Sequence, residues 1–231
     1  MFSAFTMTTE MYDYLYGSLL YVVDALYIIT FIVAILNYNK YRQTPLKYLP
    51  VLLLLTIVFE FFGKYLAQVM PGHANNSVVY NSYHILAFCF YYIIIRNYIS
   101  NVVFKKWINI FLVLFLLTSV LNPFYEDFLK RSQIIAYVVG SIFLILSIFF
   151  FYLDVLKNKT TYIIRYEPLF WISTGLLLFH VGYIPIKVIR VIYDDLRIND
   201  EMFWMMAICQ LILIICMYVC YNIGFIWARK S

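Results

Sequence analysis

The sequence predicts an all-α polytopic membrane protein whose seven transmembrane helices form one bundle. Its 231 residues are 65% hydrophobic and only 13% charged, whereas a soluble domain is roughly half apolar and about a quarter charged. The apolar residues recur in seven runs along the whole chain, which excludes a soluble domain with a single anchor. Lys and Arg are distributed unevenly among the loops between these runs, and this asymmetry predicts the orientation of the bundle.

A helix needs roughly 20 residues to cross the hydrocarbon layer of a bilayer, and the lengths of the seven runs are close to this or greater. The predicted spans are 14–37, 48–70, 79–99, 107–122, 133–156, 168–189 and 202–227. The fourth span is the shortest, and the charged stretch 188–200 is expected to extend the sixth helix beyond the membrane. Because the loops leave no room for a soluble module, we expect a single seven-helix domain over residues 1–231.

The loop cations predict an N-terminus outside the cell and a C-terminus in the cytoplasm, because cytoplasmic loops carry an excess of Lys and Arg. One side of the predicted bundle carries Lys40, Arg42, Lys47, Arg96, Lys105, Lys106, Lys157, Lys159, Arg165, Arg229 and Lys230. The other side carries Lys130, Arg131, Lys187, Arg190 and Arg197. These cations form no continuous basic stripe, so the net charge of +5 does not indicate a nucleic-acid partner.

Ionisable groups at membrane depth are the candidate functional residues, because each costs about 2.5–3.5 kcal/mol to insert and by default indicates function. The candidate pocket for a ligand or a proton consists of Asp24, Glu60, Lys64, His84, His180 and Gln210. At about 1.5 Å per residue, these side chains share the middle-to-outer layer of the bundle. We expect them to line an outward-facing cavity or to form a buried network.

Glu60 and Lys64 are four residues apart with the acid first, which places them on one helix face in the favourable order. They are interpreted either as a local pair, with Lys64 extending to the headgroups, or as a shared ligand or proton site. His84 and His180 are interpreted as buried, hydrogen-bonded histidines. Zinc held by both histidines, with Asp24 or Glu60 as a third ligand, is kept as an alternative, and so is a proton relay through Glu60 and the histidines. No other cofactor and no catalytic set is predicted.

The sixth span contains the features of a bent helix. Pro168 stands at its first turn, where the missing N–H costs nothing, and Gly175 allows close approach of another helix. Gly182 and Pro185 follow His180, so a kink is expected there. This kink is interpreted as a hinge beside a pocket, or as a feature of packing alone.

Residues 167–180 read EPLFWISTGLLLFH and resemble the P-x-F-W-I-x-x-G-x-L segment of an uncharacterised family of small seven-helix membrane proteins seen in many Bacteroidota. Residues 60–92, with YNSY at 80–83, are similar as well. The resemblance implies a seven-helix bundle in a bacterial inner membrane, and it implies no activity. Retinal proteins fit poorly, because the last span carries no Lys before Arg229.

The sequence leaves several functions open. The first is a non-enzymatic signalling or accessory protein, as in a bacterial defence or sensory operon, that senses a ligand or partner through the polar intramembrane cavity. The second is a transporter or an ion- or proton-conducting protein. The third is a membrane-embedded, metal-dependent lipid hydrolase, and a purely structural role is the last. The expected partners are the lipid bilayer, a membrane or cytoplasmic protein, and further copies of the chain.

Overall fold

The computed structural model describes residues 9–69, 76–158, 164–196 and 200–229, and these residues form helices and short connections without a strand. The long helices are α1 (Thr9–Leu36), α3 (Leu49–Val69), α4 (Ser77–Tyr98), α5 (Val102–Leu121), α6 (Ile134–Asn158), α8 (Pro168–Leu196) and α9 (Asp200–Trp227). The connections contain a short helix α2 (Tyr38–Tyr41) and the 3-10 turns η1 (Pro45–Tyr48) and η2 (Asn122–Phe124). The predicted all-α class is therefore confirmed.

Seven helices in the described part of the chain are long and apolar enough to cross a membrane. Their outward faces carry large apolar side chains such as Ile32, Val58 and Val113, all of them exposed on the isolated chain. In water such faces would be unfavourable, whereas lipid chains solvate them. The structure thus supports an integral membrane protein. The predicted orientation of the termini stays a prediction.

The predicted spans agree with the helices except near some ends. Helix α5 begins at Val102, five residues before the predicted start, because the side chain of Asn101 caps it by accepting hydrogen bonds from the backbone N–H groups of Val103 and Phe104. Helix α8 continues to Leu196, as the charged extension predicted. The predicted end of the second span at Met70 and the loop cations Lys159, Arg197 and Lys230 lie outside the described residues.

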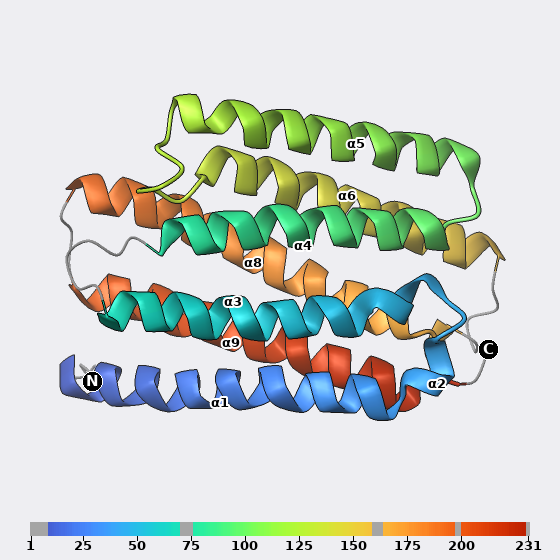
Figure 1. The fold of residues 1–231 in the computed structure, drawn as a ribbon, viewed down its shortest axis with the longest axis horizontal. Coiled ribbons are helices and arrows are strands. Elements are labelled where there is room, and N and C mark those ends of the chain that lie inside the picture. Colours follow the sequence, from blue (N-terminus) through green and yellow to red (C-terminus); the bar gives the residue numbers. More distant parts are fainter. Residues whose placement is uncertain (1–8, 70–75, 159–163, 197–199, 230–231) are drawn as a thin grey trace, which may run out of the picture.

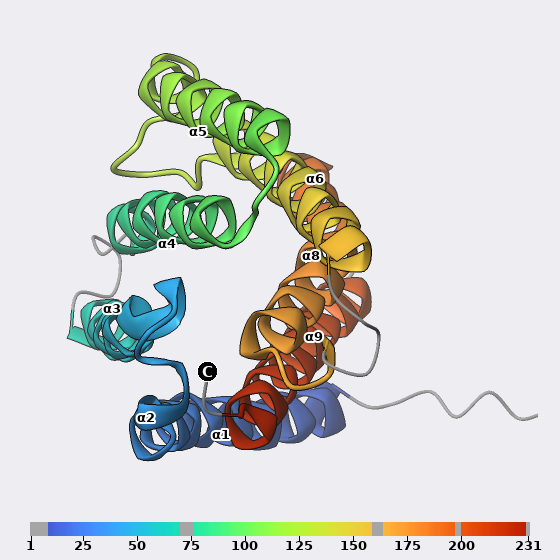
Figure 2. The same ribbon diagram turned by 90° about the vertical axis from the view of Figure 1, so that its right-hand side faces the viewer.

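Six of these helices form a ring, and α5 lies outside it (Figures 1 and 2). Around the ring, α1 packs on α3, α3 on α4, α4 on α6, α6 on α8, α8 on α9, and α9 again on α1. Helix α5 contacts α4 and α6 from the outer side. In this order α3 stands opposite α8, and α4 stands opposite α9.

Glycines bring α8 and α9 together. A Cβ on Gly175 would lie 2.8 Å from the Met217 carbonyl oxygen, and one on Gly182 would lie 2.7 Å from the Leu213 side chain. Gly175 therefore has the close-approach role that the sequence predicted. The contact with Leu213 gives Gly182 a packing role as well. Helix α8 includes Pro185, and the kink and hinge predicted at Gly182 and Pro185 stay predictions.

A buried carboxylate secures the turn between α4 and α5. Asp154 of α6 accepts hydrogen bonds from the backbone N–H groups of Ser100 at 2.8 Å and Asn101 at 3.0 Å. Both residues precede Val102, the first residue of α5, so their N–H groups have no partner within that helix. Asp154 lies within the predicted fifth span but was not among the ionisable candidates, and its role is structural.

Candidate functional site

A cavity of about 300 Å³ lies inside the ring. Its lining comes from all six ring helices and from Ser132, which precedes α6, and contains no residue of α5. It extends from Tyr91 and Tyr218 in the middle of the bundle to Asn76 and Ser77 at the start of α4. We call the end of the bundle at which α3 ends and α4 begins the α3–α4 end.

Tyrosines dominate the polar part of the cavity lining. They are Tyr27, Tyr80, Tyr83, Tyr91, Tyr137, Tyr183 and Tyr218. A tyrosine offers an aromatic face and a hydroxyl group, so such a lining can contact an apolar, cationic or hydrogen-bonding part of a ligand. Helix α4 contributes three of them on one face, beside His84.

The structure brings four of the six predicted pocket residues together on this cavity: Glu60, His84, His180 and Gln210. The other two, Asp24 and Lys64, lie outside its lining. Lys64 instead donates a hydrogen bond to the carboxylate of Asp24 and forms an ion pair with it, which joins α3 to α1. The partner of Lys64 is thus on another helix, not Glu60 one turn away.

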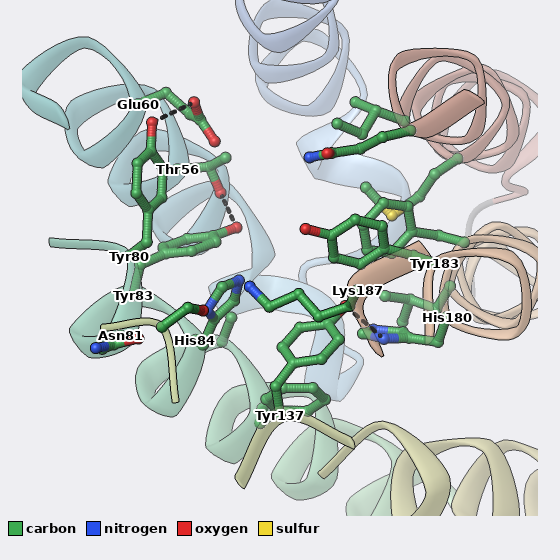
Figure 3. A pocket seen from close by; sticks show the side chains of 18 of the residues that line it. Thr56, Glu60, Tyr80, Asn81, Tyr83, His84, Tyr137, His180, Tyr183 and Lys187 are labelled. Carbon is green, nitrogen blue, oxygen red and sulfur yellow. Dashed lines mark hydrogen bonds between the residues drawn. The ribbon is translucent and has the colours of Figure 1, made fainter. Parts of the chain in front are cut away.

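Glu60 marks an acidic wall of the cavity on α3 (Figure 3). The Tyr80 hydroxyl donates a long hydrogen bond to its Oε2 at 3.4 Å. Tyr80 fits there because Gly63, one turn further along α3, has no side chain: a Cβ would lie 3.1 Å from the Tyr80 ring. In the same part of the cavity lining, the hydroxyl groups of Thr56 and Tyr83 are hydrogen-bonded to each other at 2.9 Å.

Lys187 marks a basic wall on α8, opposite α3 (Figure 3). Its Nζ lies 5.2 Å from the centre of the Tyr137 ring and 5.8 Å from that of Tyr183, which are cation–π distances. In the described residues no carboxylate lies within 4 Å of this Nζ. Lys187 was not predicted as a site residue, because it stands near the predicted end of its span and was counted among the loop cations.

His180 is buried and hydrogen-bonded between α8 and α6. Its Nδ1 lies 3.0 Å from Ser141 Oγ and 3.3 Å from Tyr137 Oη, and Phe88 packs on its ring at 5.3 Å. These contacts fix the imidazole in place. His84 packs edge-on against Tyr137 at 4.9 Å, so the two histidines lie on either side of the Tyr137 ring.

The residues proposed to bind zinc are not brought together. Asp24 pairs with Lys64 and does not line the cavity with His84 and His180. Among the residues that the structure describes, no group of three His, Cys, Asp or Glu side chains is placed to hold a metal ion. The histidines and Glu60 therefore offer polar and ionic contacts to a ligand from separate walls.

A network of amide hydrogen bonds lies on one side of the cavity, between α4 and the α5–α6 connection. Asn81 is buried and donates to the carbonyl oxygens of Phe128 at 3.0 Å and Arg131 at 2.9 Å, and it accepts from the Gln133 N–H at 3.1 Å. These bonds fasten the α5–α6 connection to α4. On the opposite side of the cavity, Gln210 of α9 accepts a hydrogen bond from Arg190 at 2.6 Å, which joins α9 to α8.

Replacing Asn81 by leucine is expected to destabilise the protein by about 1–2 kcal/mol. Three hydrogen bonds disappear, but the loop carbonyls can be rehydrated, so the loss stays below the cost of three orphaned buried groups. The connection between α5 and α6 should also become more sensitive to limited proteolysis. Thermal unfolding in detergent measures the first effect, and Ser82→Ala is the control. An Asn81→Leu variant as stable and as protease-resistant as wild type would show that the network is not needed.

Comparisons with known proteins add no assignment: no family model, curated protein or solved structure matches the chain. The resemblance of residues 167–180 to a family of small seven-helix membrane proteins therefore stays a prediction.

Proposed function

We propose that the chain is a non-enzymatic signalling or accessory protein of a bacterial inner membrane, which binds a small polar molecule in the cavity inside its ring of helices. The observation that supports this proposal is that all six ring helices contribute to the cavity lining. A bound molecule would contact every helix of the ring, so its binding energy would bias how they pack. With the N-terminus outside, the α3–α4 end faces the exterior, and the ligand enters from there.

The proposal is tested by thermal unfolding of the purified protein with panels of amino acids, monosaccharides, nucleosides and organic acids. A ligand that binds only the folded state at 100 times its dissociation constant stabilises it by about 2.7 kcal/mol. We expect at least one solute to raise the unfolding temperature of wild type. Ala87→Phe fills the cavity and should abolish this shift, whereas Ala25→Phe, on an exposed position of α1, should retain it. Equal shifts in both variants, or none in wild type, would refute the proposal.

Transport is the second candidate, and the reach of the cavity from the α3–α4 end to mid-bundle favours it. A transporter must also open the other end. Reconstitution into liposomes distinguishes the two functions: a sensor binds the stabilising solute without moving it across the bilayer. A transporter accumulates it, and Glu60→Gln and His180→Ala should then slow the flux.

A further inference from the structure

Two charged groups that line the cavity, Glu60 and Lys187, form no ion pair among the described residues. Asp24 and Lys64 neutralise each other, and Asp154 is held by two backbone N–H groups. Glu60 accepts a long hydrogen bond from Tyr80, and Tyr27 and the charge of Lys64 also contribute to its environment. The Nζ of Lys187 lies over the rings of Tyr137 and Tyr183. No ion pair of either residue occurs in the described parts of the chain.

These two groups have opposite charge and stand on opposite walls, Glu60 on α3 and Lys187 on α8. Figure 3 shows the Lys187 side chain extending from α8 across the cavity toward His84 of α4, while Glu60 lies further along the opposite wall. An unpaired charge in a low-dielectric interior is costly, and a partner of opposite charge offsets that cost only at short range. A simple anion or a simple cation would compensate one wall and leave the other uncompensated.

We propose that the cavity binds a small zwitterion, with an ammonium group at Glu60 and an anionic group at Lys187. This inference rests on the proposed function and specifies its ligand. On the Glu60 side, the Tyr80 and Tyr83 rings also offer faces and hydroxyls to an ammonium group. On the other side Lys187 supplies three N–H donors, and Arg190, one turn further along α8, adds a second positive charge to the electrostatic environment of Lys187. A cavity of about 300 Å³ fits a molecule of the size of an amino acid.

The test uses linear ω-amino acids from glycine to 6-aminohexanoate, which carry an ammonium and a carboxylate at increasing separation. Their binding to the purified wild-type protein is measured by thermal shift and calorimetry, beside n-alkylamines and n-alkanoates of equal length. We expect an optimum of chain length at which the zwitterion binds at least about tenfold more tightly than either singly charged analogue. This comparison needs no variant.

Two variants then show which residue binds the ammonium group and which binds the carboxylate. Glu60→Gln should remove the preference for the zwitterion over the alkanoate, and Lys187→Met should remove its preference over the alkylamine. Glu10→Gln and Lys106→Gln change the same charges at exposed positions and should leave affinity unchanged. An amine that binds as tightly as the zwitterion, or a carboxylate that does so, would overturn the proposal in favour of a cation or an anion site.

Failure of this proposal is distinguishable from failure of the proposed function. If no ω-amino acid binds but another solute shifts wild type and not Ala87→Phe, the ligand is not a zwitterion, yet the cavity remains a binding site. Phosphoethanolamine lipids carry the same two charges, so the series is repeated in phosphatidylglycerol nanodiscs with and without phosphatidylethanolamine. If phosphatidylethanolamine weakens the binding of the ω-amino acid, the two compete, and a lipid headgroup is the source of the zwitterion. If the affinity for the ω-amino acid is unchanged, the ligand is a free solute.

Discussion

Replacing Lys64 by methionine is expected to destabilise the folded bundle by about 3–5 kcal/mol, because it leaves the carboxylate of Asp24 inside the membrane without its counter-ion. The ion pair joins α1 to α3, and its two side chains are only 27% and 23% exposed. An aspartate side chain is short and cannot extend to the headgroups from the middle of a helix. The measurement is unfolding in mixed micelles of dodecyl maltoside and sodium dodecyl sulfate.

The reverse change, Asp24→Asn, is expected to cost less, about 1–3 kcal/mol, because Lys64 lies near the end of α3 at Val69 and its long side chain can extend to the interface. The double variant Asp24→Asn/Lys64→Met contains no unpaired charge, so it should be more stable than Lys64→Met alone. The coupling energy of the cycle should therefore exceed about 1 kcal/mol. Additive effects of the two single changes would show that the ion pair contributes nothing.

The helices could be predicted from the sequence because a spanning segment is set by local composition. Some 20 apolar residues in succession are sufficient, whichever neighbours they have. The ends depend on specific contacts instead. The start of α5 depends on the side chain of Asn101 and on Asp154, which lies 53 residues further along the chain. The second of these contacts exists only in the folded bundle, so no local pattern could reveal it.

The candidate site could be predicted in part, for a similar reason. Ionisable groups at membrane depth are costly, and this identified Glu60, His84 and His180 before their positions were known. Which charges pair depends on packing. The spacing of Glu60 and Lys64 indicated a local pair, but α1 places Asp24 beside Lys64.

Lys187 was missed although its spacing contained a usable signal. His180, Tyr183 and Lys187 stand at i, i+3 and i+7, which is one face of a helix, and all three line the cavity. With Lys187 assigned to a loop, that pattern was cut short. The sequence could not distinguish the cavity tyrosines from the others, because the chain contains 23 Tyr and tyrosine is also common at the membrane interface.

Replacing Gly175 by alanine is expected to destabilise the protein by about 3 kcal/mol, at the upper end of the cost of overpacking. The added Cβ would lie 2.8 Å from the Met217 carbonyl oxygen and 3.0 Å from the Cys220 Cβ. The first of these atoms belongs to the backbone, so no side chain can rotate away. Helices α8 and α9 must separate instead, and the dispersion contacts of their interface weaken.

Gly17→Ala is the matched control, because a Cβ at that position of α1 meets nothing within 4 Å. It should leave stability unchanged or raise it by up to about 1 kcal/mol through the higher helix propensity of alanine. Unfolding in mixed micelles compares the two variants directly.

The separation of α8 from α9 should also move Lys187 and His180 relative to Gln210 and Tyr218, which line the same cavity. Any solute that stabilises wild type should therefore bind Gly175→Ala more weakly and Gly17→Ala equally well. Equal stability of the two alanine variants would mean that α8 and α9 do not depend on close backbone contact at Gly175.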